Sequence, residues 1–422
     1  MYGVPGFSRI DSFKELLCKG ANIATTHVTF SNSTEDIINL IREQGYTLIL
    51  DEVIEVLTEF NQACDDKIGK TDIRLLQEQN MILLKENYQV IWTAKSYDGS
   101  QYSNVERCAR NNNLFCIDGK MLTWVFPYQL FTAFDEVFVM TYLYNGSYLR
   151  PYMDYYDIPV IMKSVEYSSS KERYCLTDYI KGKDQEARNG IRQLIRMYSI
   201  PAKDSLLFGK SALSTTDLKS MPHALDVINE KSFNGRMTKK RLESECNPFT
   251  KEGKKAQREL NKLEDRANRA TRLKKLLRKY LRDDMKASTR EIMWTTLSNA
   301  WTLFKDKGYS KRELTPTELA LSPEDQAKQK AETVSFVPCN ARATNIYRKK
   351  TVLAYLYNIY VNPEYEKFFL KKCIGVNEDL FAVSFLLQWI YRSAIRDGKH
   401  VNLFLPSQRM TNLLNEWLDG EL

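Results

Sequence analysis

Two adjacent carboxylates, Asp51 and Glu52, are the residues in this sequence whose types and position most suggest chemistry. They follow Thr47–Leu50, a short apolar run of the kind that forms a buried parallel strand. The carboxyl end of such a strand faces the edge of an α/β sheet where ligands bind. There, one carboxylate can coordinate the Mg²⁺ of a nucleotide complex and the other can orient an attacking water molecule. The pair therefore predicts a nucleotide–Mg²⁺ site, although acidic residues after a strand also commonly begin a helix.

The segment before this strand is expected to position a second group of polar residues. Residues 23–30 form a strand-like stretch that contains Thr25, Thr26 and His27. An amphipathic pattern over residues 37–41 predicts a helix that connects this stretch to the acidic strand. The resulting strand–helix–strand order is typical of an α/β domain with a parallel sheet.

Further elements are expected on the carboxyl side of the acidic pair. Residues 53–57 carry a helical pattern, and residues 115–125 form a hairpin signal with Asp118 and Gly119 in its turn. Residues 134–142 predict another buried strand, which ends at Thr141. Taken by itself, Thr141 is explained as an ordinary strand end in a loop.

Length and composition place the chain among globular proteins. The 422 residues are 43% hydrophobic and 12% aromatic, enough for two or three domains. No apolar run approaches the ~18–20 residues that span a bilayer, and no signal peptide opens the chain, so we expect a cytoplasmic protein without a membrane partner. Eight cysteines are scattered without a CxxC pair, which predicts neither a zinc site nor a disulfide framework.

Positive charge is concentrated in one block. The formal net charge is +8, and residues 251–290 alone hold 15 Lys and Arg against 6 Asp and Glu, so the remainder of the chain is close to neutral. Apolar residues recur there at three- and four-residue spacing, which predicts helices with one cationic face. That face is either the solvated side of a helical hairpin or a clamp for a phosphate backbone. The candidate phosphate contacts are Lys274, Lys275, Arg278 and Lys279.

Two polar groups in the second half could contact a nucleotide. A predicted strand at residues 334–338 opens onto a loop with Asn340, Arg342 and Thr344. These donors suit a phosphate or ribose, and a simple turn is the alternative.

A long helix is expected over residues 378–396. It would carry Gln388, Arg392 and Arg396 along one face at i, i+4 and i+8. Two guanidinium groups on one face favour a nearby anion, and a surface ion pair with Asp397 is the alternative.

Taken in order, the stretches ATTHVTF, LILDEV, NARATN and QWIYRSAIRDG resemble the motifs of superfamily 2 helicases, closest to a group carried by phages and mobile elements. The resemblance extends over most of the chain. It implies an α/β fold with two RecA-like parallel-sheet domains, residues 1–148 and 149–422, the second with a basic helical insertion at 236–293. It also implies ATP and Mg²⁺ as cofactors, nucleic acid as partner (DNA before RNA), and replication or phage proteins as further partners.

The resemblance assigns a role to each candidate residue. Thr25, Thr26 and His27 would contact the nucleic-acid backbone, and Asp51 and Glu52 would hold Mg²⁺ and polarise water. The remaining assignments are the coupling residue Thr141, the nucleotide contacts Asn340, Arg342 and Thr344, and the γ-phosphate group Gln388, Arg392 and Arg396. The last motif departs from the family pattern, because Tyr391 replaces a glycine and Arg396 stands one residue late.

The phosphate-binding loop of the family, GxxxxGK[ST], is missing from this sequence. Residues 64–71 have Gly69-Lys70-Thr71 but a cysteine at the first glycine position, and residues 204–211 have Asp204 there. Neither predicts a cradle of backbone N–H groups. We therefore expect a first domain truncated at its N-terminus, with the loop supplied upstream or by a partner. A DNA- or RNA-binding protein with a degenerate helicase core is the alternative function.

Overall fold

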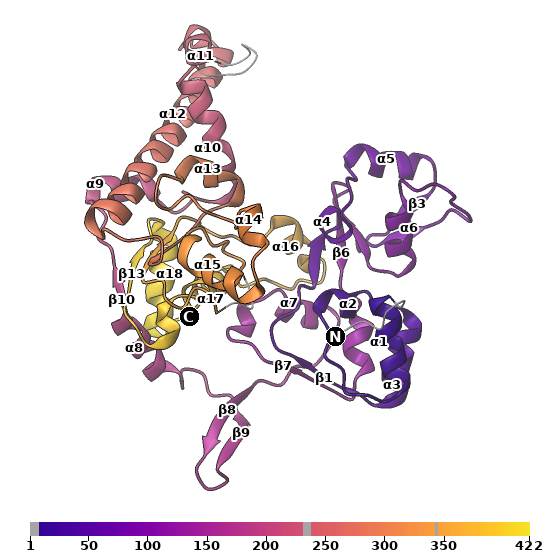
Figure 1. The fold of residues 1–422 in the computed structure, drawn as a ribbon. Coiled ribbons are helices and arrows are strands. Elements are labelled where there is room, and N and C mark those ends of the chain that lie inside the picture. Colours follow the sequence, from indigo (N-terminus) through magenta and orange to yellow (C-terminus); the bar gives the residue numbers. More distant parts are fainter. Residues whose placement is uncertain (1–7, 231–237, 342–344) are drawn as a thin grey trace. The chain divides into compact units, whose positions relative to one another are not determined.

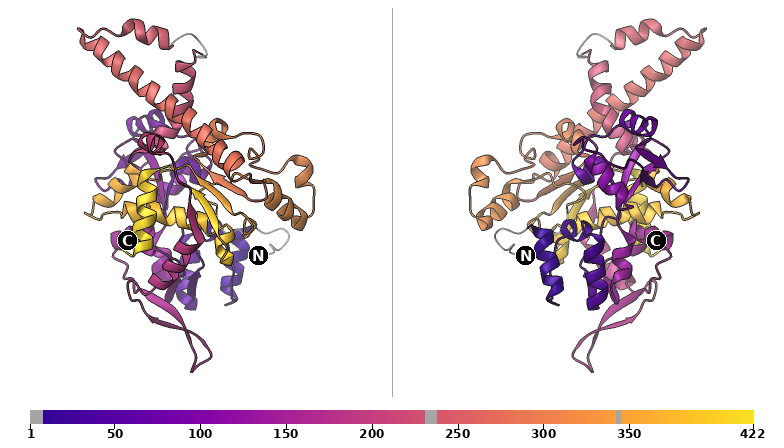
Figure 2. Two further views of the ribbon diagram at one scale, coloured as in Figure 1. Left: turned by 90° about the vertical axis from the view of Figure 1, so that its left-hand side faces the viewer. Right: turned by 90° about the vertical axis from the view of Figure 1, so that its right-hand side faces the viewer.

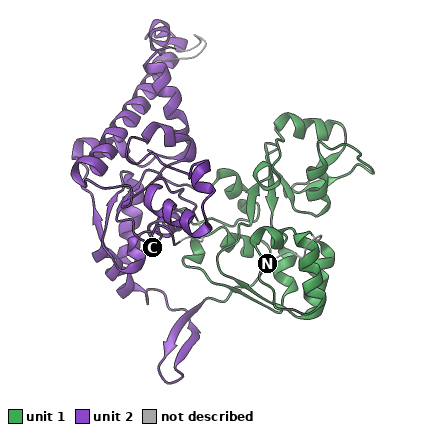
Figure 3. Cartoon of the chain, viewed as in Figure 1, with its two compact units in different colours: residues 1–162, 361–378 green, residues 163–360, 379–422 purple. Residues whose placement is uncertain are grey.

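The computed structural model describes residues 8–230, 238–341 and 345–422. The chain forms two compact units (Figure 3). Unit 1 comprises residues 1–162 and 361–378, and unit 2 comprises residues 163–360 and 379–422. The expected domain boundary at residue 148 therefore falls inside unit 1, and a segment from late in the chain returns to complete that unit.

Unit 1 contains a parallel strand pair and a group of antiparallel strands. Its helices are α1 (Arg9–Cys18), α2 (His27–Ser31), α3 (Glu35–Gln44), α4 (Phe60–Cys64), α5 (Lys70–Glu78), α6 (Ser103–Arg110), α7 (Leu149–Tyr155) and α16 (Pro363–Leu370). Its strands are β1 (Thr47–Leu50), β2 (Leu57–Glu59), β3 (Ile82–Leu84), β4 (Val90–Trp92), β5 (Leu114–Ile117), β6 (Met121–Val125) and β7 (Glu136–Val139).

The strand expected before the acidic pair is confirmed as β1. It pairs in parallel with β7, which the sequence also predicts as a strand, and Leu50 lies opposite Val139. The helix expected before β1 is α3, whose Ile37 and Ile41 are buried in the core of the unit. Unit 1 thus has the α/β character that the sequence predicts, here with one parallel strand pair.

A second core lies in the middle of unit 1. Strands β2, β6 and β5 form an antiparallel sheet, and β3 and β4 form a hairpin. The predicted turn between β5 and β6 is confirmed, because Asp118 and Gly119 have φ values of 50° and 65°, which suit the left-handed region of a tight hairpin turn. Helices α5 and α6 bury Ile73, Leu76 and Val105 in this core.

Unit 2 is organised around a parallel sheet. Its strands are β8 (Lys163–Ser168), β9 (Arg173–Asp178), β10 (Ile195–Met197), β11 (Ile292–Thr295), β12 (Val352–Tyr355) and β13 (Val401–Phe404). Its helices are α8 (Gln185–Leu194), α9 (Ala202–Ser205), α10 (Thr215–Ile228), α11 (Lys239–Glu245), α12 (Lys251–Arg278), α13 (Trp301–Phe304), α14 (Pro316–Leu319), α15 (Pro323–Thr333), α17 (Glu378–Ile390) and α18 (Gln408–Asp419).

The sheet of unit 2 has the order β10-β13-β12-β11, with every neighbouring pair parallel. All four residues of β11 and all four of β12 are buried, as expected for strands covered on both faces. Beyond β11, the predicted strand at residues 334–338 contributes a parallel bridge between Phe336 and Trp294. The α/β class predicted from sequence is therefore confirmed.

A helical arm extends from unit 2 (Figures 1 and 2). It consists of α12 packed along α10 and α11. The apolar stripe predicted from spacing is confirmed, because it is the buried side of α12 and of the turn that follows: Leu260, Leu263, Ala267, Ala270, Leu273, Leu277 and Leu281. The opposite side of α12 faces solvent and carries most of its lysines.

Three predicted elements are wrong. Residues 23–30 are not a strand, because the Thr26 hydroxyl accepts a hydrogen bond from the Thr29 N–H (3.3 Å) and caps α2 at its start. Residues 53–57 are not helical. Their burial alternates, with Ile54 and Val56 buried, and Phe126 N donates to Val56 O (2.9 Å), as in an extended chain that leads into β2.

The third correction concerns the helix expected to reach Arg396. Helix α17 ends at Ile390. The hydroxyl of the buried Ser393 donates to Ile390 O (2.6 Å) and accepts from Ile395 N (3.4 Å), and a short 3₁₀ turn follows from Ala394. Side-chain to backbone bonds of this kind compete with helix continuation. Gln388, Arg392 and Arg396 therefore do not share one helix face.

Candidate functional site

The carboxyl ends of β1 and β7 bring two predicted site residues to one edge. Asp51 directly follows β1 and is exposed. Because β1 and β7 are parallel and Met140 N donates to Leu50 O (2.8 Å), the chain after β7 leaves at the same edge, and it carries Thr141. Glu52 lies next to Asp51 and is half-buried. The strand-end position predicted for the acidic pair is thus observed.

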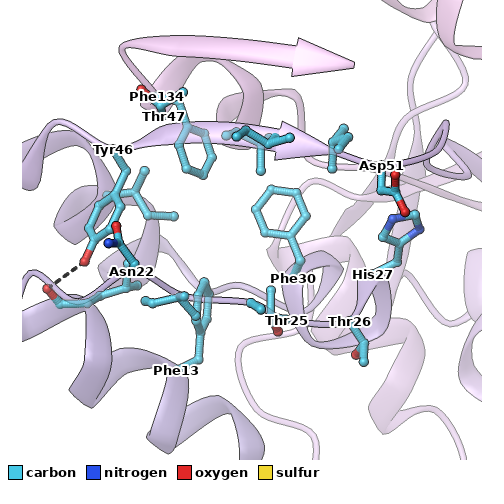
Figure 4. A pocket seen from close by; sticks show the side chains of 17 residues that line it. Phe13, Asn22, Thr25, Thr26, His27, Phe30, Tyr46, Thr47, Asp51 and Phe134 are labelled. Carbon is cyan, nitrogen blue, oxygen red and sulfur yellow. Dashed lines mark hydrogen bonds between the residues drawn. The ribbon is translucent and has the colours of Figure 1, made fainter. Parts of the chain in front are cut away.

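A cavity of about 460 Å³ lies along β1, and both Asp51 and the Thr25–His27 segment line it (Figure 4). Its lining includes all of β1 and the extended segment that leads into α2, with Thr25, Thr26 and His27. Phe13 and Phe30 line its apolar side. The structure therefore brings together four residues that the sequence singles out at separate places. The volume lies within the ~300–1,000 Å³ typical of small-molecule sites.

This arrangement fits a Mg²⁺–nucleotide complex at the metal end and lacks a phosphate cradle. Magnesium in such complexes is usually held by one or two protein carboxylates together with substrate phosphates and water. Asp51 offers an exposed carboxylate in the right place. Across the described ranges, no group of three or more His, Cys, Asp or Glu side chains could hold a metal ion.

Neither of the two segments that partly match the phosphate-binding loop, residues 64–71 and 204–211, can bind an anion. In residues 64–71, Gly69 caps α5 and its N–H donates to the Asp72 carboxylate (2.8 Å), so that helix start is already occupied by an acid. In residues 204–211, the buried Asp204 accepts two hydrogen bonds from Arg272 (2.6 and 2.7 Å). Both carboxylates would repel phosphate.

The second pair of motifs lies in unit 2. Asn340 is exposed after the 334–338 segment that bridges to β11, whereas Arg342 and Thr344 fall outside the described residues. The Arg396 guanidinium donates to the side chain of Asn345, so the two motifs adjoin each other at this point. Gln388 is exposed near the end of α17, and Arg392 is half-buried in the turn that follows.

The ion pair proposed as the alternative for these arginines has a different partner. Asp397 accepts from Arg348 rather than from Arg392 or Arg396, and this contact lowers the pKa of Asp397. The carboxylate of Asp397 is therefore engaged by Arg348. Arg396 is exposed beside Asn345.

The four basic candidates of the arm differ in their surroundings. Lys274 and Lys275 are exposed and make no ion pair with any residue that the structure describes. Arg278 lies 3.7 Å from Asp306, and Lys279 lies 2.7 Å from Asp284. Two of the four charges are thus partly neutralised inside the protein, a distinction that sequence spacing does not reveal.

Further cations on α12 were not singled out by the sequence argument. Lys251, Lys255, Arg258 and Lys262 are exposed at intervals of three and four residues, so they follow one side of the helix. Next along that side, Arg266 and Arg269 approach Asp217 of α10 at 3.8 and 2.8 Å. Residues 251–262 of α12 therefore present a row of cations without a described ion pair, in addition to Lys274 and Lys275 near the other end of the helix. Helical spacing within the basic block could have found it.

The sequence analysis also did not identify a pair of neighbouring thiols in unit 1. The Sγ atoms of Cys64 in α4 and Cys108 in α6 lie 3.8 Å apart, and the Arg107 guanidinium is 3.9 Å from Cys64 Sγ. The hydrogen bond from Cys108, with help from Arg107, lowers the pKa of Cys64 to about 7, while Cys108 has a raised pKa. Forty-four residues separate the two, so no local motif marks them.

Comparison with known proteins relates both halves of the chain to one protein. Residues 65–124 match the family model described as the YonV middle domain, and residues 242–418 match the YonV C-terminal Rossmann-like domain. The chain is homologous to the SPbeta prophage-derived uncharacterized protein YonV of Bacillus subtilis (strain 168), with 27% identity over 420 residues, 98% of this chain and 83% of that protein.

These matches agree with the two folding regions seen in the structure. The first match covers most of the second core of unit 1, and the second covers all of α12 and the strands β11, β12 and β13 of the parallel sheet. The expected likeness to a phage-borne protein is thus shown. No solved structure matches the chain significantly. Within the described segments, no helix is both long enough and apolar enough to cross a membrane.

Proposed function

We propose that this protein is a nucleic-acid-dependent nucleoside triphosphatase of the helicase or translocase type, serving phage or mobile-element replication. The observation that carries the proposal is the edge where β1 ends. There Asp51 and the Thr25–His27 segment line one cavity, and the chain that carries Thr141 leaves β7 at the same sheet edge. In a RecA-like domain this is the edge at which a nucleotide and its Mg²⁺ bind.

Each residue at this edge has a chemical task in the proposal. ATP would supply the phosphoryl group and Mg²⁺ would neutralise its charge. Asp51 would hold the metal ion and Glu52 would orient the attacking water. Thr25, Thr26 and His27, which face the same cavity as Asp51, would contact the nucleic-acid backbone, and Thr141 would link the two events.

Unit 2 carries the residues to which the resemblance assigns nucleotide contacts and the stabilisation of phosphoryl charge. Arg392 and Arg396 are the candidates for transition-state stabilisation, with Gln388 beside them. The loop with Asn340, Arg342 and Thr344 would contact the nucleotide. The support for grouping these segments is the Arg396–Asn345 hydrogen bond, which joins the two motifs within one unit.

The proposal is tested by phosphate release with and without single-stranded DNA. We expect ATP turnover that depends on Mg²⁺ and rises with DNA, and we expect Glu52→Gln and Arg392→Ala each to lower it by at least about 100-fold. The matched control is Asp135→Asn, which removes an exposed carboxylate at the amino end of β7, away from the proposed metal. Turnover that Glu52→Gln and Arg392→Ala leave unchanged would refute the assignment.

A second function, nucleic-acid binding without hydrolysis, is favoured by the uncompensated cations of α12. It needs only the arm, whose exposed lysines can contact phosphates in any sequence. Under this alternative the protein binds DNA in a salt-dependent manner while Asp51→Asn and Glu52→Gln have no effect on any measured property. Phosphate release and DNA affinity, measured on the same samples, separate the two functions.

A further inference from the structure

Two cysteines in the second core of unit 1 lie close enough to form a bond with each other. Cys64 is the last residue of α4, and Cys108 lies in α6. Both helices pack on the strands of this core, α4 on β6 and α6 on β4 and β5. The two Sγ atoms are 3.8 Å apart, and a disulfide bond needs about 2.05 Å. A further approach of about 1.8 Å would therefore join two helices whose cysteines are 44 residues apart in the sequence.

The position of Cys64 at the end of its helix favours this approach. The residue after it, Asp65, has a φ of 50°, so no further helical turn follows the cysteine. A change of rotamer about the Cα–Cβ bond of a cysteine moves its sulfur by more than the remaining separation. Side-chain rotation is thus large enough to bring the two sulfurs into bonding distance.

The two thiols differ in their access to solvent. Cys64 is half-buried, whereas only 2% of Cys108 is exposed. A small dissolved molecule can therefore reach the sulfur of Cys64, and Cys108 meets that molecule only through Cys64. This difference fixes the order in which the two thiols would react.

The surroundings of Cys64 favour its thiolate, which is the reactive form of a cysteine. The Cys108 thiol and the Arg107 guanidinium, 3.9 Å away, lower the pKa of Cys64 to about 7, so close to half of it is ionised at neutral pH. Asp66 opposes this effect, and its carboxylate accepts a hydrogen bond from Asn104 (3.3 Å).

The surroundings of Cys108 keep it protonated until Cys64 has reacted. The hydrogen bond to Cys64, burial, and the charge on Cys64 raise the pKa of Cys108. Two of these three causes come from Cys64 and end when its sulfur becomes part of a neutral disulfide. Arg107, which lowers the pKa of Cys108, stays in place. Reaction at Cys64 thus makes Cys108 easier to ionise.

We propose that Cys64 and Cys108 form a reversible disulfide by exchange with a small disulfide such as oxidised glutathione. Cys64 is the attacking thiol, Cys108 is the resolving thiol, and Arg107 positions the charge of the first step. The inference goes beyond the proposed function, because none of these residues belongs to the cavity beside β1 and the exchange needs no nucleotide.

The exchange has two steps. The Cys64 thiolate attacks one sulfur of oxidised glutathione, the glutathione S–S bond breaks, and one glutathione leaves as a thiolate that takes a proton from water. Cys108 then gives its proton to water, and its sulfur attacks that of Cys64 and releases the second glutathione. Two protein thiols lose two electrons and two protons, and one glutathione disulfide is reduced to two thiols.

The test follows the reduced full-length protein in oxidised glutathione at pH 7, with acid quenching and peptide mapping by mass spectrometry. We expect a linked pair of peptides that joins Cys64 to Cys108 and is lighter by about 2 Da than the two separate peptides, and excess reduced glutathione should split it. In Cys108→Ala, glutathione should remain on Cys64 at a level at least about tenfold higher than in the unmodified protein, because no neighbouring thiol displaces it.

The matched control is Cys116→Ala. It removes another thiol of the same core, of which 1% is exposed, and it should form the bridge as the unmodified protein does.

Three outcomes would overturn the proposal. Absence of the linked peptides from the unmodified protein would do so without any variant, even if Cys108→Ala failed to fold. Equal amounts of glutathione on Cys64 in the unmodified protein and in a folded Cys108→Ala would show that Cys108 does not resolve the first product. A link from Cys64 to any other cysteine, or to a second copy of the chain on a non-reducing gel, would assign the reaction to a different pair.

Discussion

Removing two lysines from the arm should weaken DNA binding more than removing the next two cations along the same helix. The perturbations are Lys274→Gln/Lys275→Gln and, as the matched control, Arg278→Gln/Lys279→Gln. Both double variants remove the same formal charge from the same end of the arm. They differ because Arg278 and Lys279 are already held by acids at 3.7 and 2.7 Å, whereas no ion pair to a described residue restrains Lys274 or Lys275.

The size of the effect follows from counterion release. Each phosphate neutralised on duplex DNA contributes about 0.9 to the slope of log affinity against log salt concentration. Loss of two contacts in Lys274→Gln/Lys275→Gln should therefore reduce the slope by about 1.8. Across a fourfold rise in salt, the unmodified protein should then lose about 12-fold more affinity than this variant does. The control should reduce the slope by less than half as much, because its cations are shared with Asp306 and Asp284.

The assay is fluorescence anisotropy with a labelled duplex at three or more salt concentrations. Circular dichroism should show unchanged helix content in both variants, since all four side chains are exposed. Equal slopes for the two double variants would refute the reasoning that internal ion pairs decide which cations bind phosphate. An unchanged slope in Lys274→Gln/Lys275→Gln would refute the role of the arm altogether.

Three further outcomes are expected. Lys350 is fully buried, bonded to Thr289 O and Val334 O, and burial lowers its pKa to about 8. Above pH 8 the unfolded chain therefore binds a proton that the folded chain lacks, so the free energy of unfolding rises with pH. In urea denaturation, the free energy of unfolding of the unmodified protein should rise by about 3 kcal/mol relative to that of Lys350→Met between pH 8 and 10.5. The absence of such a rise would contradict this prediction. The pH dependence of Cys64 alkylation, followed by mass spectrometry, should have its midpoint near pH 7, and Arg107→Gln should raise that midpoint. An unchanged midpoint in the variant would exclude the Arg107 guanidinium as a cause of the lowered Cys64 pKa. Leu273→Ala should lower the free energy of unfolding by about 2–5 kcal/mol, because the side chain is fully buried between α12 and its neighbours, and a loss below about 1 kcal/mol would place it outside the core.

The parts of the fold that the sequence predicts well are those with local causes. The stripe of α12 recurs from Leu260 to Leu277, so its period is unambiguous, and the Asp118-Gly119 turn is set by backbone chemistry that few residues tolerate. By contrast, β-branched residues at 23–30 favour a strand, and a single hydroxyl at Thr26 is enough to start a helix instead. Residues 53–57 are too few to separate a period of two from one of 3.6.

In the candidate site, too, the features with a local cause could be predicted from the sequence and those that depend on distant segments could not. The position of Asp51 at a strand end follows from the apolar run before it, and the structure adds that Thr25, Thr26 and His27 share its cavity. Sequence could not show which cations of the arm are paired, because Asp306 and Asp217 reach them from other elements.

The central claim is that the carboxyl end of β1 holds the metal ion of a nucleotide complex, and binding of Mn²⁺ with ATP tests it most directly. Mn²⁺ takes the place of Mg²⁺, and electron paramagnetic resonance counts the ions bound. The unmodified protein should bind one Mn²⁺ only when ATP is present, Asp51→Asn should bind it at least about tenfold more weakly, and Asp135→Asn should behave as the unmodified protein does. Equal Mn²⁺–ATP affinity in the unmodified protein and Asp51→Asn, or no ATP-dependent Mn²⁺ binding at all, would contradict the account.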